Sequence, residues 1–334
     1  MLVFSTETSC DETSVCIMKE DKTILSHIVN SQTVHNKHGG VVPELASRAH
    51  LEILQQITKE ALKESGVKLN DIKLFSATCG PGLIGGLLIG STFTKSLSIG
   101  NSKPFIPINH LEAHILSSFF NNEIKFPHLC LLITGGHTQI YFLKNNNDIT
   151  LIGETIDDAI GEAFDKVAKI LGLSYPGGPE IEKKATQGNE NSFKLPKPLI
   201  NDDSSNFSFS GLKTSVNLIA KKNIIDHSFI NDMSASFQKC VGDILTIKLN
   251  RVIAELYKRN TEDLSVSVVG GVANNDYLKK CFKTIEEEKN IKFIYPPKYM
   301  MNDNAAMIAW ATILKHRNNH DLNFKPNPRL TVKE

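Results

Sequence analysis

Two histidines four residues apart are the first feature of this sequence that could do chemistry. His110 and His114 would lie on one face of a helix, where both imidazole rings could bind the same metal ion. A chain with 11 histidines in 334 residues gives about a third of one such pair by chance, and a second pair, His316 and His320, does occur. The spacing therefore leaves two interpretations open, a pair of metal ligands or a solvated, hydrogen-bonded pair.

Glycine turns are the second feature with chemical potential. Gly135-Gly-His-Thr138 and Gly270-Gly271 each follow an apolar run typical of a strand, so their backbone N–H groups could approach phosphate oxygens closely. Plain turns use glycine in the same way, and the sequence does not separate the two roles.

Asp165 lies one turn beyond Glu162 in an amphipathic helical pattern, which by itself is typical of surface carboxylates.

A third string, Gly80-Pro-Gly-Leu-Ile-Gly85, fits the G-x-G-x-x-G pattern of dinucleotide sites. Such sites also use an acidic residue about twenty positions later for the ribose hydroxyl. No Asp or Glu occurs between Gly86 and Leu111. The string therefore favours a tight strand-to-helix turn.

The elements that must position these residues alternate between strand and helix. Strands are predicted at 2–5 and 14–18 around a polar turn that carries Asp11 and Glu12, and at 129–134 and 139–143 around the 135–138 turn. Helices are expected at 45–61, from 82 onward, at 157–171 and at 234–258, with further strands at 72–78 and 264–269. Residues 175–210 are predicted to form an irregular insert. The alternation favours an α/β fold, and the repeated hairpin suggests two similar lobes.

Composition bounds the function classes. The length fits about two domains, and 41% hydrophobic with 22% charged residues is typical of a folded globular protein. A net charge of +1 provides no global attraction for a polyanion, so contact with a nucleic acid needs a local patch or a partner. Six cysteines without a C-x-x-C pair predict a reducing, cytoplasmic compartment.

Taken together, ordered motifs along nearly the whole chain resemble the TsaD family, the tRNA adenosine threonylcarbamoyltransferases, long described as O-sialoglycoprotein endopeptidases. The motifs are Glu7-Thr-Ser-Cys-Asp-Glu-Thr13, His38-Gly-Gly-Val-Val-Pro-Glu-Leu-Ala-Ser-Arg-Ala-His50, Gly80-Pro-Gly-Leu-Ile-Gly-Gly-Leu, Asn109-His-Leu-Glu-Ala-His114, Thr134-Gly-Gly-His-Thr138, Gly161-Glu-Ala-Phe-Asp-Lys166, Tyr175-Pro-Gly-Gly178, Phe207-Ser-Phe-Ser-Gly-Leu-Lys213, Gly270-Gly-Val-Ala-Asn274 and Asp303-Asn-Ala-Ala-Met307. Thr134 stands where many relatives have Ser and keeps the hydroxyl. Met301-Asn302 replace the usual Cys-Thr before Asp303.

The resemblance implies the two-lobed actin, Hsp70 and sugar-kinase architecture, also called the ASKHA fold, with a cleft between the lobes. We expect the lobes at 1–125 and 126–334, with the C-terminal helix allowed to cross back to the first lobe. The resemblance also implies one divalent metal, with Fe²⁺ favoured and Zn²⁺ as the alternative, bound by His110, His114 and Asp303.

The implied reaction moves a threonylcarbamoyl group from L-threonylcarbamoyl-adenylate to N6 of the adenosine next to the anticodon, in tRNAs that read codons starting with A, and releases AMP. Asp11 and Glu12 are the residues we expect to orient the threonyl group or to manage the amine's proton. Implied partners are the tRNA anticodon stem-loop, a TsaB-like paralogue and a TsaE-like ATPase. The resemblance assigns Asp165 and Gly178 to the ribose side of the adenylate and Asn274 to the neighbourhood of the adenine. Its further adenylate contacts are Leu132, Ile133, Thr134, Gly135 and Gly136.

Two other function classes stay open at this point. A metalloprotease of the H-E-x-x-H type needs Glu directly after the first histidine, where this chain has Leu111. A non-catalytic ATP-binding chaperone or a kinase-like protein of the same superfamily would not need His110, His114 and Asp303 together. Metal analysis of the purified protein separates these classes from the transferase.

Overall fold

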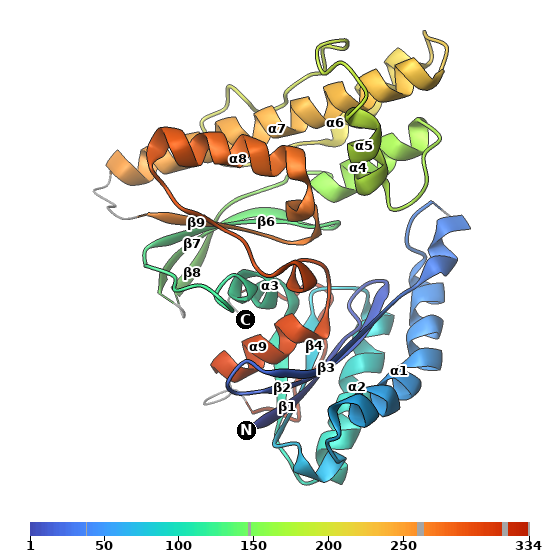
Figure 1. The fold of residues 1–334 in the computed structure, drawn as a ribbon, viewed down its shortest axis with the longest axis vertical. Coiled ribbons are helices and arrows are strands. Elements are labelled where there is room, and N and C mark those ends of the chain that lie inside the picture. The colour runs from blue at the N-terminus through green and yellow to red at the C-terminus, as the bar shows by residue number, and fades with distance from the viewer. Residues whose placement is uncertain (38, 146–147, 259–263, 316–319, 333–334) are drawn as a thin grey trace. The chain divides into compact units, whose positions relative to one another are not determined.

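The computed structural model describes residues 1–37, 39–145, 148–258, 264–315 and 320–332, so that His38 and His316 lie outside the described residues. The chain divides into two compact units, drawn in Figure 1. Unit 1 combines Met1–Asn121 with Pro296–Glu334, and unit 2 is Asn122–Tyr295. The segment from Pro296 onward groups with the first unit, which is the crossing back that the expected lobes of 1–125 and 126–334 allowed for the C-terminal helix.

Unit 1 is built on a mixed sheet with the strand order β3-β2-β1-β4-β5. β1, β2 and β3 are antiparallel neighbours, whereas β4 and β5 run parallel to β1. The polar turn with Asp11 therefore joins β1 to β2, as the sequence predicts. The strands are β1 Leu2–Glu7, β2 Glu12–Lys19, β3 Ile24–Ser31, β4 Leu74–Gly80 and β5 Phe105–Asn109.

Helices cover both faces of this sheet. α1 (Pro43–Ser65) and α2 (Ile84–Gly100) lie on one face, and α9 (Ala305–Lys315) with α3 (His110–Ser117) lies on the other (Figure 1). α1 ends at Gly66, whose φ of 66° is the left-handed conformation that glycine commonly adopts at the C-terminal end of a helix. α9 is apolar nearly all round and buried, because it packs between the sheet and α3. This packing explains why the C-terminal segment belongs to unit 1.

The C-terminal residues after α9 return across the glycine string of unit 1. Asn327 N–H donates to the Cys79 carbonyl at 2.9 Å, and Gly82 N–H donates to the Pro328 carbonyl at 3.3 Å. Gly80 has a φ of 145°, and a Cβ there would collide with the Asn327 carbonyl. Protein atoms thus occupy the space that a dinucleotide phosphate would need at this turn, in agreement with the plain strand-to-helix interpretation.

Unit 2 repeats the mixed pattern with the strand order β10-β9-β6-β7-β8. β6, β7 and β8 are antiparallel neighbours, and β9 and β10 run parallel to β6. The hairpin β6-β7 is the second strand pair that the sequence predicts. The strands are β6 His128–Ile133, β7 Thr138–Asn145, β8 Asp148–Glu154, β9 Ser265–Val269 and β10 Phe293–Ile294.

The helices of unit 2 lie on one side of its sheet (Figure 1). Alternate residues of β6 point into this helical layer, where Phe164 and Phe237 pack edge to face with ring centroids 5.0 Å apart. The helices are α4 Ile160–Ile170, α5 Gly177–Ala185, α6 Ser210–Ala220, α7 His227–Lys258 and α8 Asp276–Lys289.

Short 3₁₀ helices occur in both units. Unit 1 contains η1 Thr33–Lys37, η2 Leu69–Asp71 and η4 Lys298–Met300, and unit 2 contains η3 Gly271–Asn274.

One part of the predicted irregular insert is wrong: α5 lies inside 175–210. Pro176 caps this helix, and Pro179 falls in the first turn, where a backbone N–H has no partner within the helix and its loss costs little. The rest of the segment up to Phe209 consists of turns, bends and irregular backbone, apart from one isolated β-bridge between Phe207 and Thr155.

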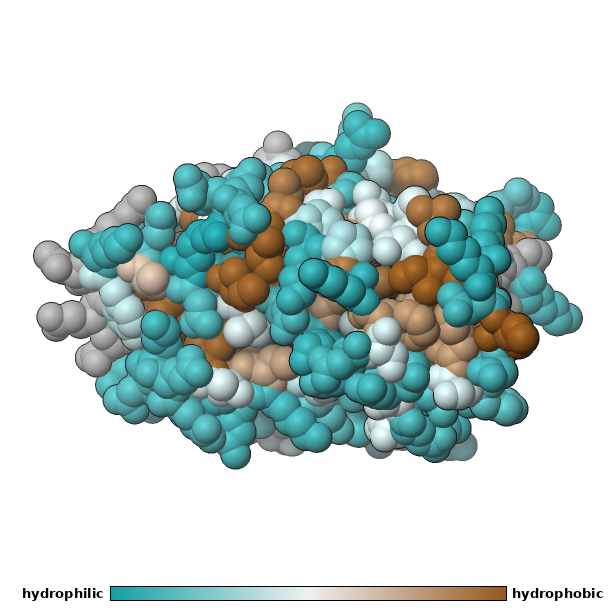
Figure 2. Space-filling model, turned by 90° about the horizontal axis from the view of Figure 1, so that it is seen from above, coloured by the Kyte–Doolittle hydropathy of each residue, from teal (hydrophilic) through white to brown (hydrophobic). Residues whose placement is uncertain are grey.

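The surface seen in Figure 2 is mostly hydrophilic, with smaller hydrophobic patches between the polar side chains. Exposed apolar side chains of unit 2 include Leu218, Ile224 and Ile225, at and beyond the end of α6. Among the described residues, none of the helices combines the length and the apolar character that crossing a bilayer requires.

Candidate metal centre and nucleotide-binding turns

The position of the two histidines follows from how α3 begins. Asn109 ends β5 and caps α3, and its side-chain oxygen accepts hydrogen bonds from the N–H groups of Leu111 at 3.0 Å and Glu112 at 3.1 Å. His110 is therefore the first helical residue, and His114 follows one turn later on the same face. The Asn109 side-chain N–H₂ donates to the Thr331 carbonyl at 2.7 Å, so the returning C-terminal segment orients this cap.

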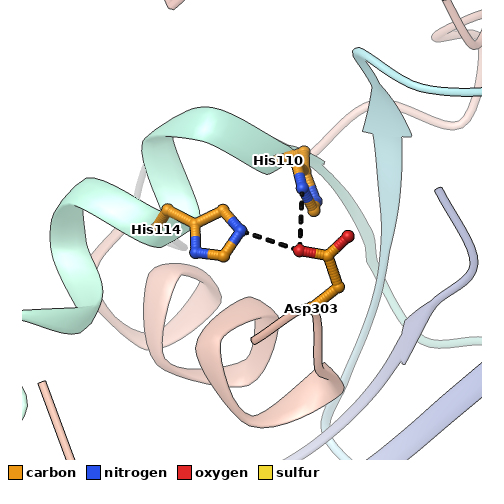
Figure 3. A group of neighbouring side chains, drawn as sticks. All are labelled: His110, His114 and Asp303. Carbon is orange, nitrogen blue, oxygen red and sulfur yellow. Dashed lines mark hydrogen bonds and ion pairs between the residues drawn. The ribbon is translucent and has the colours of Figure 1, made fainter. Parts of the chain in front are cut away.

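Asp303 completes a group of three side chains within unit 1. Its Oδ1 lies 3.0 Å from His114 Nε2 and 3.4 Å from His110 Nε2, as Figure 3 shows. The two imidazole rings are nearly perpendicular, with centroids 4.7 Å apart. One nitrogen or oxygen atom from each residue lies within 4.8 Å of the others. The structure thus brings together the three residues that the resemblance assigns to a metal.

Electrostatics tie these residues to one another. Burial lowers the pKa of His110, but the negative charges of Asp303 and Glu7 outweigh burial and raise this pKa well above its ordinary value. Burial lowers the pKa of His114, with the hydrogen bond to Asp303 opposing it. Burial raises the pKa of Asp303, but the two histidines outweigh it and hold this pKa well below its ordinary value.

The donor set fits a divalent metal. Two imidazole nitrogens and one carboxylate oxygen suit ions such as Fe²⁺ and Zn²⁺, and three protein ligands leave coordination positions open for other molecules. His114 Nδ1 is buried and has no hydrogen-bond partner among the described residues, so the contact of Nε2 with Asp303 is what orients the ring. The chemistry of the three atoms therefore matches the metal that the resemblance implies.

Asp11 and Glu12, the residues expected to act on the threonyl group or the amine, lie in the β1-β2 turn and at the start of β2. Burial raises the pKa of Glu12 well above its ordinary value, and the negative charges of Asp303 and Asp11 raise it further. Glu12 is therefore close enough to Asp303 for their charges to interact.

Two buried residues near this turn escaped the sequence-based reasoning. Glu7 accepts a hydrogen bond from Ser9 N–H at 2.6 Å and lies 3.2 Å from His110 Nδ1. His50 binds the Cys10 carbonyl at 3.0 Å through Nε2 and pairs with the Thr13 hydroxyl at 2.8 Å through Nδ1. Both belong to motifs that carry the family resemblance, which was the available signal for a role beyond packing.

In unit 2, a tight turn follows β6. The Thr134 hydroxyl accepts hydrogen bonds from the N–H groups of Gly136 at 3.3 Å and His137 at 3.0 Å. The side chains of Leu132 and Ile133 are fully buried in β6, so any contact from these two residues to a ligand must come from the backbone. The turn is therefore a place where main-chain groups are presented.

The glycines of this region fall into two groups. A Cβ added at Gly161 would lie 2.7 Å from the Gly135 Cα and the Thr134 carbonyl, so close packing requires glycine there. A Cβ added at Gly135, Gly136 or Gly178 would meet no heavy atom within 4 Å. Open space thus adjoins the backbone at the three glycines that the resemblance assigns to the adenylate.

The remaining residues of the predicted nucleotide site lie on neighbouring elements of unit 2. β6 and β9 are adjacent and parallel, so the turn after Ile133 and the η3 segment with Asn274 start from the same edge of the sheet. The Asn274 side chain donates to the Gly271 carbonyl at 3.3 Å. Asp165 Oδ1 accepts from Gly177 N–H at 2.7 Å, which joins Asp165 to the start of α5 next to Gly178.

α3 does not carry the general-base glutamate that a metalloprotease would need beside its histidines. Glu112 is buried, and its carboxylate forms an ion pair with Lys315 of α9. Leu111 occupies the position at which a zinc protease of the H-E-x-x-H type carries its glutamate.

Comparison with known proteins gives a family match over most of the chain. The family model of TsaD, tRNA N6-adenosine threonylcarbamoyltransferase, matches residues 23–310. A curated relative with that name from Rickettsia massiliae is 46% identical over 338 residues, which take in 99% of this chain and 98% of the relative.

Solved structures agree in fold. HypF of T. kodakarensis matches 94% of this chain and 47% of its own with a TM-score of 0.61 at 13% identity. Component A of (R)-2-hydroxyglutaryl-CoA dehydratase from Acidaminococcus fermentans matches 94% of this chain and 99% of its own with a TM-score of 0.51 at 16% identity. The α/β fold class with actin, Hsp70 and sugar-kinase likeness is confirmed.

Proposed function

Since this chain belongs to the TsaD family of tRNA N6-adenosine threonylcarbamoyltransferases, we propose that it transfers the threonylcarbamoyl group of L-threonylcarbamoyl-adenylate to tRNA. The acceptor is N6 of the adenosine next to the anticodon in tRNAs that read codons starting with A, and AMP leaves. The family match over 23–310 is the observation that carries this proposal. The His110, His114 and Asp303 group supports the proposal, because a metal bound there could activate the carbamoyl donor as a Lewis acid.

The chemistry explains what the site must do. An exocyclic amine conjugated to a purine is a poor nucleophile, so the enzyme must make the carbonyl carbon more electrophilic and stabilise the leaving AMP. A divalent metal held by His110, His114 and Asp303, Fe²⁺ in preference to Zn²⁺, would supply Lewis-acid polarisation of a carbamoyl or phosphate oxygen.

The chain's own residues supply the rest of the proposed site. The backbone N–H group of Gly135 stabilises negative charge on the phosphate, and the open space beside Gly135 and Gly136 supports this role of the turn. The Asp165 carboxylate, beside Gly178, accepts from ribose hydroxyls, since each carboxylate oxygen can accept more than one hydrogen bond. Asn274 binds near the adenine. Leu132, Ile133 and Thr134 contribute through the β6 backbone and the turn after it.

Asp11 and Glu12 orient the threonyl group or accept the proton that the amine loses. The electrostatic interaction of Glu12 with Asp303 supports their placement beside the metal centre of unit 1.

The proposed partners are the tRNA anticodon stem-loop, a TsaB-like paralogue and a TsaE-like ATPase, with the reaction in the cytoplasm. A net charge of +1 supports the need for helpers, because clustered Lys and Arg normally supply most of the affinity for tRNA. Lysines between 183 and 213 are the expected local patch for the stem-loop. Lys197 in this patch forms an ion pair with Asp243 at 2.6 Å, which leaves Lys194 as the sharper residue for charge reversal.

A reconstituted assay tests the proposal. Synthetic threonylcarbamoyl-adenylate and an unmodified tRNA are incubated with this protein, with and without the two helpers, and nucleosides of the anticodon loop are measured by mass spectrometry. We expect threonylcarbamoyladenosine only with the full set. No product with all components present contradicts the transferase function, and full activity of the isolated chain contradicts the partner requirement.

A further inference from the structure

Glu7 is a buried carboxylate that the proposed reaction does not use. It is the last residue of β1, and its side chain is 0% exposed. A carboxylate removed from water needs hydrogen-bond donors or a positive charge to offset the lost solvation. Its contacts therefore show what this carboxylate stabilises.

Both oxygens of Glu7 have partners. Oε1 accepts from Ser9 N–H at 2.6 Å, and Oε2 accepts from the Thr78 hydroxyl. Oε2 also lies 3.2 Å from Nδ1 of His110. The other nitrogen of that ring, Nε2, lies 3.4 Å from Asp303 Oδ1. The His110 ring is thus held between two carboxylates, with one at each nitrogen.

We propose that Glu7 is a positioning residue that fixes the metal-binding tautomer of His110. An ionised carboxylate has no proton to donate, so Nδ1 must carry the hydrogen in this contact. A metal that binds Nε2 would take the place of the hydrogen that faces Asp303. Nδ1 would keep its hydrogen toward Glu7, and the ring would then be the neutral tautomer that a metal ligand requires. This inference rests on the proposed metal centre.

The surroundings favour Glu7 over the other neighbour of Nδ1. The Ser9 hydroxyl lies 3.3 Å from Nδ1, but a hydroxyl both donates and accepts and therefore selects neither tautomer. Ser9 N–H and the Thr78 hydroxyl hold the Glu7 carboxylate in place from two sides. His114 has no such arrangement, because its Nδ1 lacks a hydrogen-bond partner among the described residues. Glu7 thus acts on one of the two histidines.

Glu7→Gln tests this role while keeping the shape of the side chain. If the amide oxygen keeps the bond from Ser9 N–H, the amide N–H₂ faces His110 Nδ1 and favours the wrong tautomer. We expect zinc affinity of the metal-free protein to fall about 10-fold to 100-fold, the range found when a carboxylate behind a metal-binding histidine is lost. The matched control is Glu112→Gln, which removes a buried carboxylate from α3 that pairs with Lys315. Its zinc affinity should stay within about 3-fold of the wild type.

A spectroscopic readout separates positioning from general damage. In the zinc-loaded wild type, ¹⁵N-labelled histidine spectra should show the hydrogen of His110 on Nδ1. Glu7→Gln should lose or displace that signal. If Glu7→Gln does not fold, Glu7→Asp decides, since it keeps the charge one methylene farther back and should weaken zinc binding by a few-fold with a displaced signal.

Three results would overturn the inference. Zinc affinity and the Nδ1 signal unchanged in the glutamine variant, or in the aspartate variant where that one decides, would show that Glu7 has no part in positioning. An equal loss of affinity in Glu112→Gln would show that any buried carboxylate change disturbs α3. Failure of the wild type itself to bind zinc or iron would remove the metal centre and the inference with it.

Discussion

The two units present their functional groups in opposite ways. Unit 1 gathers side chains from segments that are far apart in the sequence, since Asp303 follows His114 by 189 positions. Unit 2 presents backbone at turns directly after strands, where Gly135 and Gly136 adjoin open space. The comparison teaches that the first site depends on the identity of a few buried side chains, whereas the second depends on the absence of side chains.

This difference shows in charge as well. The centre of unit 1 combines two buried imidazoles with the buried Glu7 and the partly buried Asp303, so each substitution there leaves a charge without its partner. The Thr134 turn of unit 2 is organised by hydrogen bonds from a neutral hydroxyl to two backbone N–H groups. We therefore expect variants of one unit to leave the ligand of the other unit bound.

The largest effect is expected from His110→Ala combined with His114→Ala. Removal of two of three ligands should weaken metal binding more than about 1,000-fold, on the order of 4 kcal/mol or more. Metal content of the purified protein, measured by mass spectrometry, should fall to near zero, while adenosine affinity, measured by calorimetry, should stay within about 3-fold.

The control is the other histidine pair with the same spacing, His316→Ala with His320→Ala, which should keep its metal. Unchanged metal content in the His110 and His114 variant would return that pair to the chance interpretation. A parallel loss of adenosine binding would contradict the expectation that a variant of unit 1 leaves the ligand of unit 2 bound.

The second largest effect is a pH dependence of stability that arises in unit 2 from one buried histidine. His128 of β6 is buried between the hydroxyls of Ser265 and Ser267, and burial lowers its pKa to about 4 from 6.5. The unfolded chain takes up a proton as the pH falls below 6.5, and the folded chain does so only near 4, so the free energy of unfolding drops across this window. The full drop is about 3 kcal/mol.

Urea unfolding of wild type and His128→Gln at pH 7 and pH 4.5 measures this term. The other titratable groups are the same in both proteins. The pH-dependent change in unfolding free energy of the wild type, minus that of His128→Gln, is therefore the contribution of His128. Equal pH dependence in the two proteins would contradict the assignment.

A glycine pair tests the meaning of open space in unit 2. Gly161→Ala places a methyl group 2.7 Å from the Gly135 Cα, and this overpacking should cost about 1–3 kcal/mol of stability. Gly136→Val should leave thermal stability nearly unchanged but reduce AMP affinity about 10-fold, because the added side chain fills the space that the proposed phosphate occupies. Full affinity in Gly136→Val would remove this turn from the proposed site.

The smallest effect concerns Asp165. Asp165→Ala should weaken nucleotide binding by about 1–3 kcal/mol, but it also deletes the bond from Gly177 N–H. Asp165→Asn keeps an acceptor for Gly177 and should weaken adenosine binding by about 1 kcal/mol. The same variant should not change the affinity for 2′,3′-dideoxyadenosine, because this ligand lacks the ribose hydroxyls that Asp165 would accept from. Calorimetry that shows equal effects on both ligands would limit Asp165 to holding the start of α5.

Much of this architecture was predictable where the signal is local. The hairpins β1-β2 and β6-β7 follow from alternating apolar runs around polar turns, and Gly66 marks the end of α1. α5 was missed because its prolines and glycines indicate a turn until their place in the first helical turn is known. The contact between Glu7 and His110 depends on two chain segments meeting, which no periodicity encodes.

The candidate site divides in the same way. The spacing of His110 and His114 suggests a shared ligand, but Asp303 is attached to them only by resemblance until the fold places it 3.0 Å from His114. Nothing in the sequence separates Gly136, which faces open space, from Gly161, which faces backbone. That distinction depends on what packs nearby, and it needs coordinates.

The discontinuity of unit 1 has a consequence for how the protein is made. A ribosome that has just added His114 must still add 189 residues to reach Asp303, including all of unit 2, and at about 5–20 residues per second this takes roughly 10–40 s. The Thr331 carbonyl that orients the cap of α3 arrives later still. The nascent chain therefore exposes two histidines to the cell's metals before their carboxylate exists, and correct loading has to wait until synthesis has passed Asp303.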